Sequence, residues 1–175
     1  MMPRLITRFA HEAHGTASTE MALMVPLLVL LLFGGMEAGH YFWTEHRVIK
    51  AVRDGARYAG RQSFSAYTCA NVDATVRGNI SLLTRTGQLD ATKDTNEYRK
   101  VKDWTDATAG DANLLKVTVA CSAATTTGIY KNQVGGAPVI TVAASVSYPS
   151  LFQVLGAIDG NARLKATARS AVMGI

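Results

Sequence analysis

One carboxylate lies where a carboxylate is costly, at the start of the longest apolar run in the chain. The sequence reads Gly15-Thr16-Ala17-Ser18-Thr19-Glu20, and no side chain from Met21 to Phe33 is charged or polar. A charged group beside lipid is retained mainly where it has a function. It is far less costly when it is paired with an opposite charge. Glu20, five residues after a glycine that follows a short basic leader, is therefore the first residue for which the sequence indicates a function.

The chain has two cysteines, Cys69 and Cys121, and both follow the apolar run. An even pair of cysteines in an exported domain favours a disulfide. Closing the loop between them would stabilise the fold by roughly 4 kcal/mol in the chain-entropy model. Two buried free thiols in a cytosolic domain are the alternative.

No set of residues indicates a catalytic site. No histidine follows Gly60, which excludes most Ser-His and Cys-His mechanisms. His11-Glu12-Ala13-His14 is one residue shorter than a His-Glu-x-x-His zinc motif. There is also no phosphate-binding glycine loop followed by a lysine. We therefore expect that the protein is not an enzyme and needs no cofactor.

A group of acidic and amide side chains in the middle of the chain could in principle bind calcium. It consists of Asp90, Asp94, Asn96 and Glu97. These residues lack the ligand spacing and the central glycine of an EF-hand loop. A solvated polar loop is therefore the preferred interpretation, and no metal site is expected.

The element that must position Glu20 is a hydrophobic helix. Met21–Met36 contains only apolar residues and glycine. As a helix it would span about 24 Å, slightly less than a bilayer core of about 30 Å. Tyr41-Phe42-Trp43 follows and resembles an interfacial aromatic belt. Pro26 removes one backbone N–H donor and predicts a kink in the helix. A membrane helix tolerates this where neighbouring helices satisfy the freed carbonyl.

Three kinds of apolar segment fit this pattern: a cleavable signal peptide, a signal anchor and a buried core helix. The apolar run is long for a signal peptide, and no clean Ala-x-Ala site follows it. A helix that is apolar on all sides is also a poor fit to the core of so small a domain. A membrane anchor is therefore favoured.

The net charge of +5 indicates no nucleic-acid partner, because the basic residues are not arranged in a stripe interleaved with aromatic residues. Several of them follow the apolar run, where they suit anionic lipid headgroups or an acidic neighbouring subunit: Arg47, Lys50, Arg53, Arg57 and Arg61. Arg4 and Arg8 precede the run. Counting positive charges would place the C-terminal side in the cytoplasm, whereas the cysteine pair favours export.

The helical pattern continues beyond the aromatic belt and predicts one helix from Thr16 to about Gly60. Ala51, Gly55 and Ala59 form a small-residue stripe that allows another helix to approach closely. Docking of the stripe onto the protein's own sheet is an equally good explanation.

A second helix is predicted after the first, with Asn71 as its N-cap and Gly87 at its end. The polar segment 86–113 follows and is expected to form a long excursion at the surface.

Three alternating segments near the C-terminus predict a half-buried antiparallel sheet. Their inward positions are Leu115, Val117, Val119 and Cys121 in the first, Ile140, Val142, Ala144, Val146 and Tyr148 in the second, and Leu164, Ala166 and Ala168 in the third. Gly135-Gly136 marks a turn before the second segment. Leu151–Ile158 is expected to form a short apolar turn or helix. The fold class is therefore α+β, with a long N-terminal helix that packs on a small sheet of about three to four strands.

Together these residues resemble a known family. Gly15-Thr16-Ala17-Ser18-Thr19-Glu20 looks like the cleavage site of type IV prepilins. The start of the apolar run, Met21–Leu28, and the later segment Ala51–Ala59 resemble TadE-like proteins. These are minor pilin-like components of the tight-adherence (Flp, type IVc) pilus. The resemblance is best over residues 15–61, and TadE and TadF types fit equally well.

The resemblance implies a role for each part of the chain. Residues 1–15 would be a prepilin leader, 16–43 the transmembrane helix, 44–61 a helical stem and 62–175 a periplasmic α+β domain. Prepilin peptidase would cut between Gly15 and Thr16 on the cytoplasmic side of the bacterial inner membrane. Glu20 would then pair with the freed amine of a neighbouring subunit. A favourable charge at the N-terminal end of a helix is the simpler explanation for Glu20.

The implied function is that of a pseudopilin-like minor subunit in pilus initiation or assembly. Its domain of more than 100 residues after the stem departs from the much shorter abundant pilins of this system. The implied partners are prepilin peptidase, other pilins and minor pilins, the inner-membrane assembly platform and membrane lipid. The alternative is an unprocessed bitopic envelope protein whose outer domain binds a ligand or partner.

Overall fold

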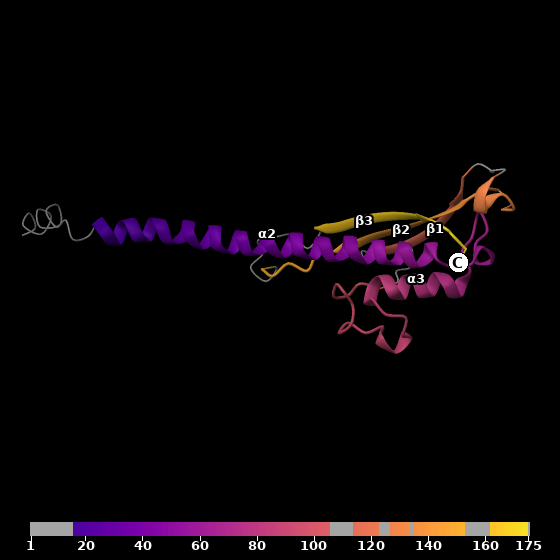
Figure 1. The fold of residues 1–175 in the computed structure, drawn as a ribbon. Helices are drawn as coiled ribbons and strands as arrows, with labels where there is room; N and C mark the ends of the chain where they lie inside the picture. The colour runs from indigo at the N-terminus through magenta and orange to yellow at the C-terminus, as the bar shows by residue number, and fades with distance from the viewer. Residues whose placement is uncertain (1–15, 106–113, 123–126, 134, 153–161, 175) are drawn as a thin grey trace, which may run out of the picture. The chain divides into compact units, whose positions relative to one another are not determined.

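The computed structural model describes residues 16–105, 114–122, 127–133, 135–152 and 162–174. The chain forms two compact units, Met1–Gly39 and His40–Ile175. The first unit is described over residues 16–39, which are entirely helical. The second is an α+β unit in which helices pack on a three-stranded sheet (Figure 1). The predicted fold class is confirmed.

Helix α2 extends from Thr16 to Gly60 and therefore contributes residues to both units. Its predicted extent is confirmed, because no residue after the aromatic belt interrupts the helical pattern. The helix continues through Pro26. Proline cannot donate the backbone hydrogen bond of that position. The kink that this loss predicts stays a prediction.

Helix α3 extends from Ala74 to Thr86. Its N-cap is Asp73, whose carboxylate accepts hydrogen bonds from the backbone N–H groups of Thr75 and Val76 at 2.9 and 3.2 Å. The prediction of Asn71 as the cap was wrong. Asn71 instead exchanges backbone hydrogen bonds with Thr68 in a turn, so the cap and the start of the helix lie two residues later than predicted.

The other end of α3 follows the prediction. Gly87 ends the helix in the left-handed conformation, with φ of 84°. Its N–H donates to the carbonyl of Leu83 at 2.8 Å. This is a conformation that glycine adopts without steric cost.

The sheet contains strands β1 (Leu114–Cys121), β2 (Pro138–Ser147) and β3 (Arg163–Ala171) in the order β1-β2-β3. Both pairings are antiparallel, with Val142 opposite Val117 in β1 and Ala168 in β3. Burial alternates along each strand in the predicted phase. Gly135 and Gly136 precede β2 with φ of 90° and 93°, as the predicted turn requires. Most of the predicted apolar turn 151–158 lies outside the described residues.

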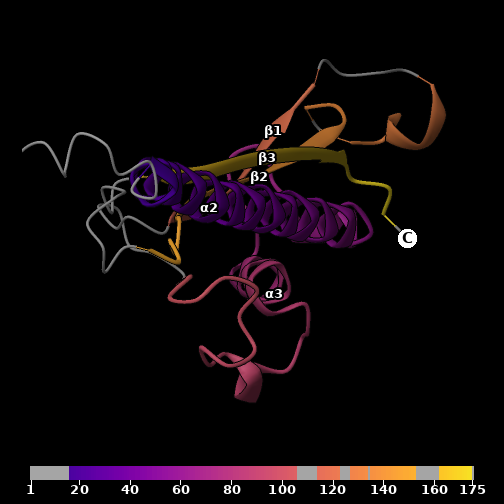
Figure 2. The ribbon, with the colours of Figure 1, turned by 90° about the vertical axis from the view of Figure 1, so that its left-hand side faces the viewer.

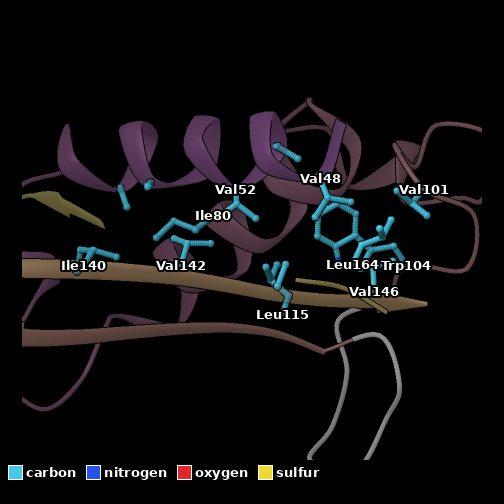
Figure 3. Packing of buried hydrophobic residues seen from close by; sticks show 14 of the residues in the cluster. Val48, Val52, Ile80, Val101, Trp104, Leu115, Ile140, Val142, Val146 and Leu164 are labelled. Carbon is cyan, nitrogen blue, oxygen red and sulfur yellow. The ribbon is translucent and has the colours of Figure 1, made fainter. Parts of the chain in front are cut away.

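In the second unit, the C-terminal half of α2 lies between the sheet and α3 (Figure 2). Val48 and Val52 of α2 are at most 1% exposed and face the side chains of Val142, Val146 and Leu164 on the sheet (Figure 3). Full burial of one such side chain contributes about 1.5–3 kcal/mol. The apolar stripe of α2 and the inward face of the sheet therefore form one core.

The small-residue stripe of α2 is part of this core. Ala51 and Ala59 are completely buried, and Gly55 is also buried. A Cβ atom at Gly55 would collide with the hydroxyl of Thr84 in α3. The stripe therefore packs within the protein itself, and at Gly55 its neighbour is α3 rather than the sheet.

The surface excursion after α3 includes a short 3₁₀ turn, η3 (Ala91–Lys93). Most of its described residues are exposed or partly exposed, as predicted. Val101 and Trp104 are exceptions, because they are 3% and 0% exposed and belong to the core. The excursion is therefore fixed to the second unit by two buried side chains.

Candidate functional site

The first unit presents an exposed apolar surface that contains one charged side chain. All residues from Ala17 to Met36 are exposed, including Leu23 at 79% and Leu30 at 68%. Glu20 is exposed near the start of this segment and is the single charge within it. Soluble monomers rarely expose an apolar patch of such extent. The segment therefore requires an apolar environment outside its own chain.

By length and composition, α2 is able to cross a membrane, and its most apolar part is almost entirely unburied. This exposure separates it from the core helix of a soluble domain, which would be mostly buried. The structure thus supports a single-pass membrane protein with the span near the N-terminus.

The position of Glu20 within α2 is relevant to the simpler explanation of the carboxylate, a favourable interaction with the helix dipole. The described helix begins at Thr16, and there is no acidic residue in its first turn. The helix dipole favours a carboxylate mainly within the first turn. Glu20 lies four residues after Thr16, the first described residue of α2, so interaction with the helix dipole is still an alternative explanation of the carboxylate.

The predicted processing site lies at the border of the described residues. Gly15 is outside them, and Thr16 is the first residue of α2. Thr16 and Glu20 are separated by four positions, so they lie about one turn apart on the same side of the helix. After cleavage, a new amine at Thr16 and the Glu20 carboxylate would both be near the start of the exposed segment.

Cys69 and Cys121 lie at disulfide-bonding distance, with Cα atoms 5.1 Å apart. The pair joins the loop before α3 to the end of β1. Gly135 lies beside it, since a Cβ atom there would be 2.5 Å from the sulfur of Cys69. The geometry agrees with the predicted pairing.

Sequence reasoning missed an aromatic cluster that begins at the first residue of the second unit. The Nδ1 atom of His40 and the hydroxyl of Tyr148 form a hydrogen bond of 3.0 Å. Tyr41 meets the ring of Tyr148 edge-on, with ring centres 5.1 Å apart. Tyr148 is 5% exposed. The predicted aromatic belt is therefore partly a packing contact, and only Phe42 and Trp43 remain mostly exposed.

The acidic group considered as a calcium site has another role. Arg85, which is 5% exposed, donates to both carboxylate oxygens of Asp94 at 2.7 and 2.9 Å. Arg99 donates to the same carboxylate at 3.1 Å. Burial raises the pKa of Asp94, but the two arginines outweigh it and hold the pKa below its usual value. The Asp94 carboxylate therefore binds two arginines and holds the surface excursion against α3.

No group of three or more potential metal ligands occurs among the residues described, which leaves out segments such as 106–113. His11 and His14 lie outside these residues.

Comparison with known proteins gives one match. The family model described as "TadE-like protein" matches residues 15–57. No curated protein and no solved structure matches the chain. The match begins at Gly15, and it covers the whole exposed apolar segment and most of the rest of α2. Residues 15–57 thus carry the pattern of the TadE-like family, and over this segment the chain is similar to TadE-like proteins of the tight-adherence pilus system.

Proposed function

We propose that the chain is a minor pilin-like subunit that prepilin peptidase cleaves between Gly15 and Thr16. The mature protein is held in the inner membrane by α2 and acts in initiation or assembly of a tight-adherence pilus. It acts by binding other subunits and catalyses no reaction. The exposed apolar segment with its single carboxylate, inside the TadE-like match, carries this proposal.

Glu20 is proposed to bind the free amine at Thr16 of a neighbouring subunit within the bilayer. An unpaired carboxylate at a helix centre costs about 2.5–3.5 kcal/mol on insertion scales, and less near the interface. A neighbour that supplies the amine removes most of that cost. The carboxylate therefore favours assembly over an isolated helix.

The second unit is proposed to face the periplasm. The cysteine pair at bonding distance supports this orientation, because structural disulfides persist in oxidising compartments. The N-terminus then lies in the cytoplasm, where cleavage takes place.

Intact-mass measurement of the chain from membranes, with and without the peptidase, tests the processing step. We expect a mature chain that begins at Thr16 only when the peptidase is present. A chain that keeps residues 1–15 under both conditions would contradict processing and favour an unprocessed bitopic envelope protein.

The role of Glu20 is tested with Glu20→Gln, which keeps the size of the side chain and removes its charge. We expect normal cleavage and at least tenfold less protein in sheared pili and cross-linked assemblies. Glu45→Gln, the same change in the second unit's part of α2, is the matched control and should incorporate normally. Equal incorporation of both variants would refute the pairing role.

A further inference from the structure

The half of α2 in the second unit carries a continuous basic face. Arg47, Lys50, Arg53 and Arg57 follow one another at spacings of three or four residues, so they lie along one side of α2, and Arg61 directly follows the end of the helix at Gly60. Lys50, Arg53, Arg57 and Arg61 are exposed, and Arg47 is partly exposed. We call these five residues the basic face.

The basic face lies opposite the buried side of the helix. Val48 and Val52 point to the core, and each is about half a turn around the helix from Lys50. The same burial that fixes the valines therefore directs the basic side chains to solvent. Packing of the second unit fixes where this charge points.

One acidic residue, Asp54, lies on this side of the helix, and it already forms an ion pair. Lys100, from the surface excursion, places its Nζ atom 3.8 Å from the Asp54 carboxylate. Burial lowers the pKa of Lys100, and Lys50 and Arg47 lower it further, while Asp54 opposes them. The surroundings of Asp54 thus hold an excess of positive charge.

The described part of the chain supplies no ion pair for the rest of the basic face. The three ion pairs found there join Asp94 to two arginines and Asp54 to Lys100. Lys50, Arg53 and Arg57 take part in none of them. Like charges this close repel one another, so an anion bound among them would be stabilised.

A shallow hollow lies among these three cations. Its volume is about 360 Å³, and it is lined by His46, Ile49, Lys50, Arg53, Asp54 and Arg57. This is enough for a phosphate group with some of its hydration water. Ile49 adds apolar surface to the cationic lining.

An exposed aromatic residue lies on the same side of the helix, one turn before the basic face. Trp43 is 55% exposed, and the guanidinium of Arg47 lies over its ring at 4.5 Å from the centre. Phe42 next to it is 59% exposed. Tryptophan at the end of an apolar segment is typical of the headgroup region, and basic residues next to such a segment attract anionic lipids.

We propose that the hollow binds the phosphate of an anionic phospholipid headgroup, with Lys50, Arg53 and Arg57 as its cationic ligands and Trp43 at the membrane interface. The proposal rests on insertion of α2 in a bilayer, as in the proposed function. An acidic protein could also bind the basic face, but it would not account for the exposed Phe42 and Trp43 that directly precede this face.

The test uses the full chain in nanodiscs that contain phosphatidylcholine and phosphatidylglycerol, one of which is brominated near the headgroup. The chain has two tryptophans, and Trp104 is fully buried, so bromine quenching reports mainly on Trp43. We expect brominated phosphatidylglycerol to quench several times more strongly than brominated phosphatidylcholine at equal content. Trp43→Phe should abolish the lipid-dependent part of the signal.

The decisive comparison is between two triple variants that remove the same charge. Lys50→Gln/Arg53→Gln/Arg57→Gln changes the hollow, and Arg163→Gln/Lys165→Gln/Arg169→Gln changes three exposed positions of β3. Each cation near an anionic surface contributes about a fivefold preference. We therefore expect the first variant to lose the preference for phosphatidylglycerol, by tenfold or more in apparent affinity. The second variant should keep it.

Several results would overturn the proposal. Equal quenching by both lipids would show an inserted helix without a headgroup site, which leaves the proposed function intact. No quenching by either lipid would refute insertion and thus both proposals. Displacement of the lipid by inorganic phosphate, beyond the effect of sodium chloride at equal ionic strength, would assign the site to free phosphate. Capture of an acidic subunit without any lipid preference would assign it to protein.

Discussion

The contact between α2 and α3 at Gly55 allows a sharp test of the fold. A Cβ atom at Gly55 would collide with the hydroxyl of Thr84 and would lie 3.3 Å from its Cβ atom. The Thr84 hydroxyl donates to the carbonyl of Ile80 at 2.7 Å, and the residue is fully buried. Rotation of the Thr84 hydroxyl away from an added methyl would therefore break this buried hydrogen bond.

The expected cost of Gly55→Ala follows from these contacts. Alanine gains about 0.5–1 kcal/mol over glycine within a helix. Overpacking of a filled site costs about 1–3 kcal/mol, and an unsatisfied buried hydroxyl costs about 1–3 kcal/mol. We expect the variant to be less stable than the wild type by about 1–3 kcal/mol. Gly78→Ala in α3 is the matched control, because no atom outside the chain neighbours and the local helix backbone lies within 4 Å of the added methyl. It should stabilise the protein by about 0.5–1 kcal/mol.

The assay is denaturant unfolding of the full chain in detergent micelles, followed by near-UV circular dichroism and repeated in a Gly55→Ala/Thr84→Ala double mutant. In the double mutant, removal of the Thr84 hydroxyl should restore at least about 1 kcal/mol of the free energy of unfolding that Gly55→Ala loses. This difference is the coupling energy of the double-mutant cycle. If Gly55→Ala and Gly78→Ala stabilise equally, α2 and α3 do not approach each other as closely as described. A loss that appears only in assembled pili would instead assign Gly55 to a contact with another subunit.

Three further predictions concern the second unit, and each is measured by unfolding of the full chain. Asp94→Asn leaves Arg85 buried without its counter-charge and should cost about 2 kcal/mol. Since the folded pKa of Asp94 is lowered, its contribution to the free energy of unfolding should be present above pH about 4 and be lost as pH falls through the folded pKa. If Asp94→Asn leaves the loss of stability at acid pH unchanged, this expectation is contradicted. Burial, and to a lesser degree a neighbouring tyrosine, raises the pKa of Tyr67 to about 12. Stability from this residue should therefore be complete below pH about 10 and decline toward pH 12, and Tyr67→Phe should flatten that decline. Replacing Cys69 and Cys121 by alanine should cost about 4 kcal/mol for a sequence separation of 52, and a loss below about 1 kcal/mol would show that the pair does not constrain the unfolded chain.

The sequence predicted those elements whose pattern is local. Helix α2 was predictable because its apolar run and its core stripe follow one helical period without a break. The strands were predictable because the alternation of apolar and polar residues indicates both a β-strand and the face that points to the core, as at Val142 and Leu164. A one-residue shift would have exposed the whole apolar set.

The N-cap of α3 shows where local pattern is insufficient. Asn71 and Asp73 are both good capping residues. The choice between them depends on a turn in which Asn71 bonds to Thr68, followed by a bridge between Tyr67 and Val72. Such a turn is a property of the folded unit, so capping preference alone could not select Asp73.

Long-range partners were also hidden from sequence reasoning. Trp104 lies in a polar segment, yet it fills the core between α2 and the sheet. Arg85 and Asp94 are on different elements, and His40 and Tyr148 are 108 positions apart. An isolated tryptophan in a polar stretch was the one available signal, because exposing so large an apolar side chain is unfavourable.

The burial of the small-residue stripe limits how this protein can contact its neighbours. Ala51, Gly55 and Ala59 allow close helix approach, but they are already used within the second unit. From residue 40 onward, α2 therefore offers other subunits mainly its basic face, which repels an identical face. From Ala17 to Met36 it offers an exposed apolar surface, and lipid tails are as apolar as this surface, so the hydrophobic effect does not drive helices together there. Glu20 is the single charge on that surface, and a carboxylate with one partner amine fixes the register between two helices. If the proposed function holds, the most specific contact of the helix is thus made by a residue whose partner belongs to another chain.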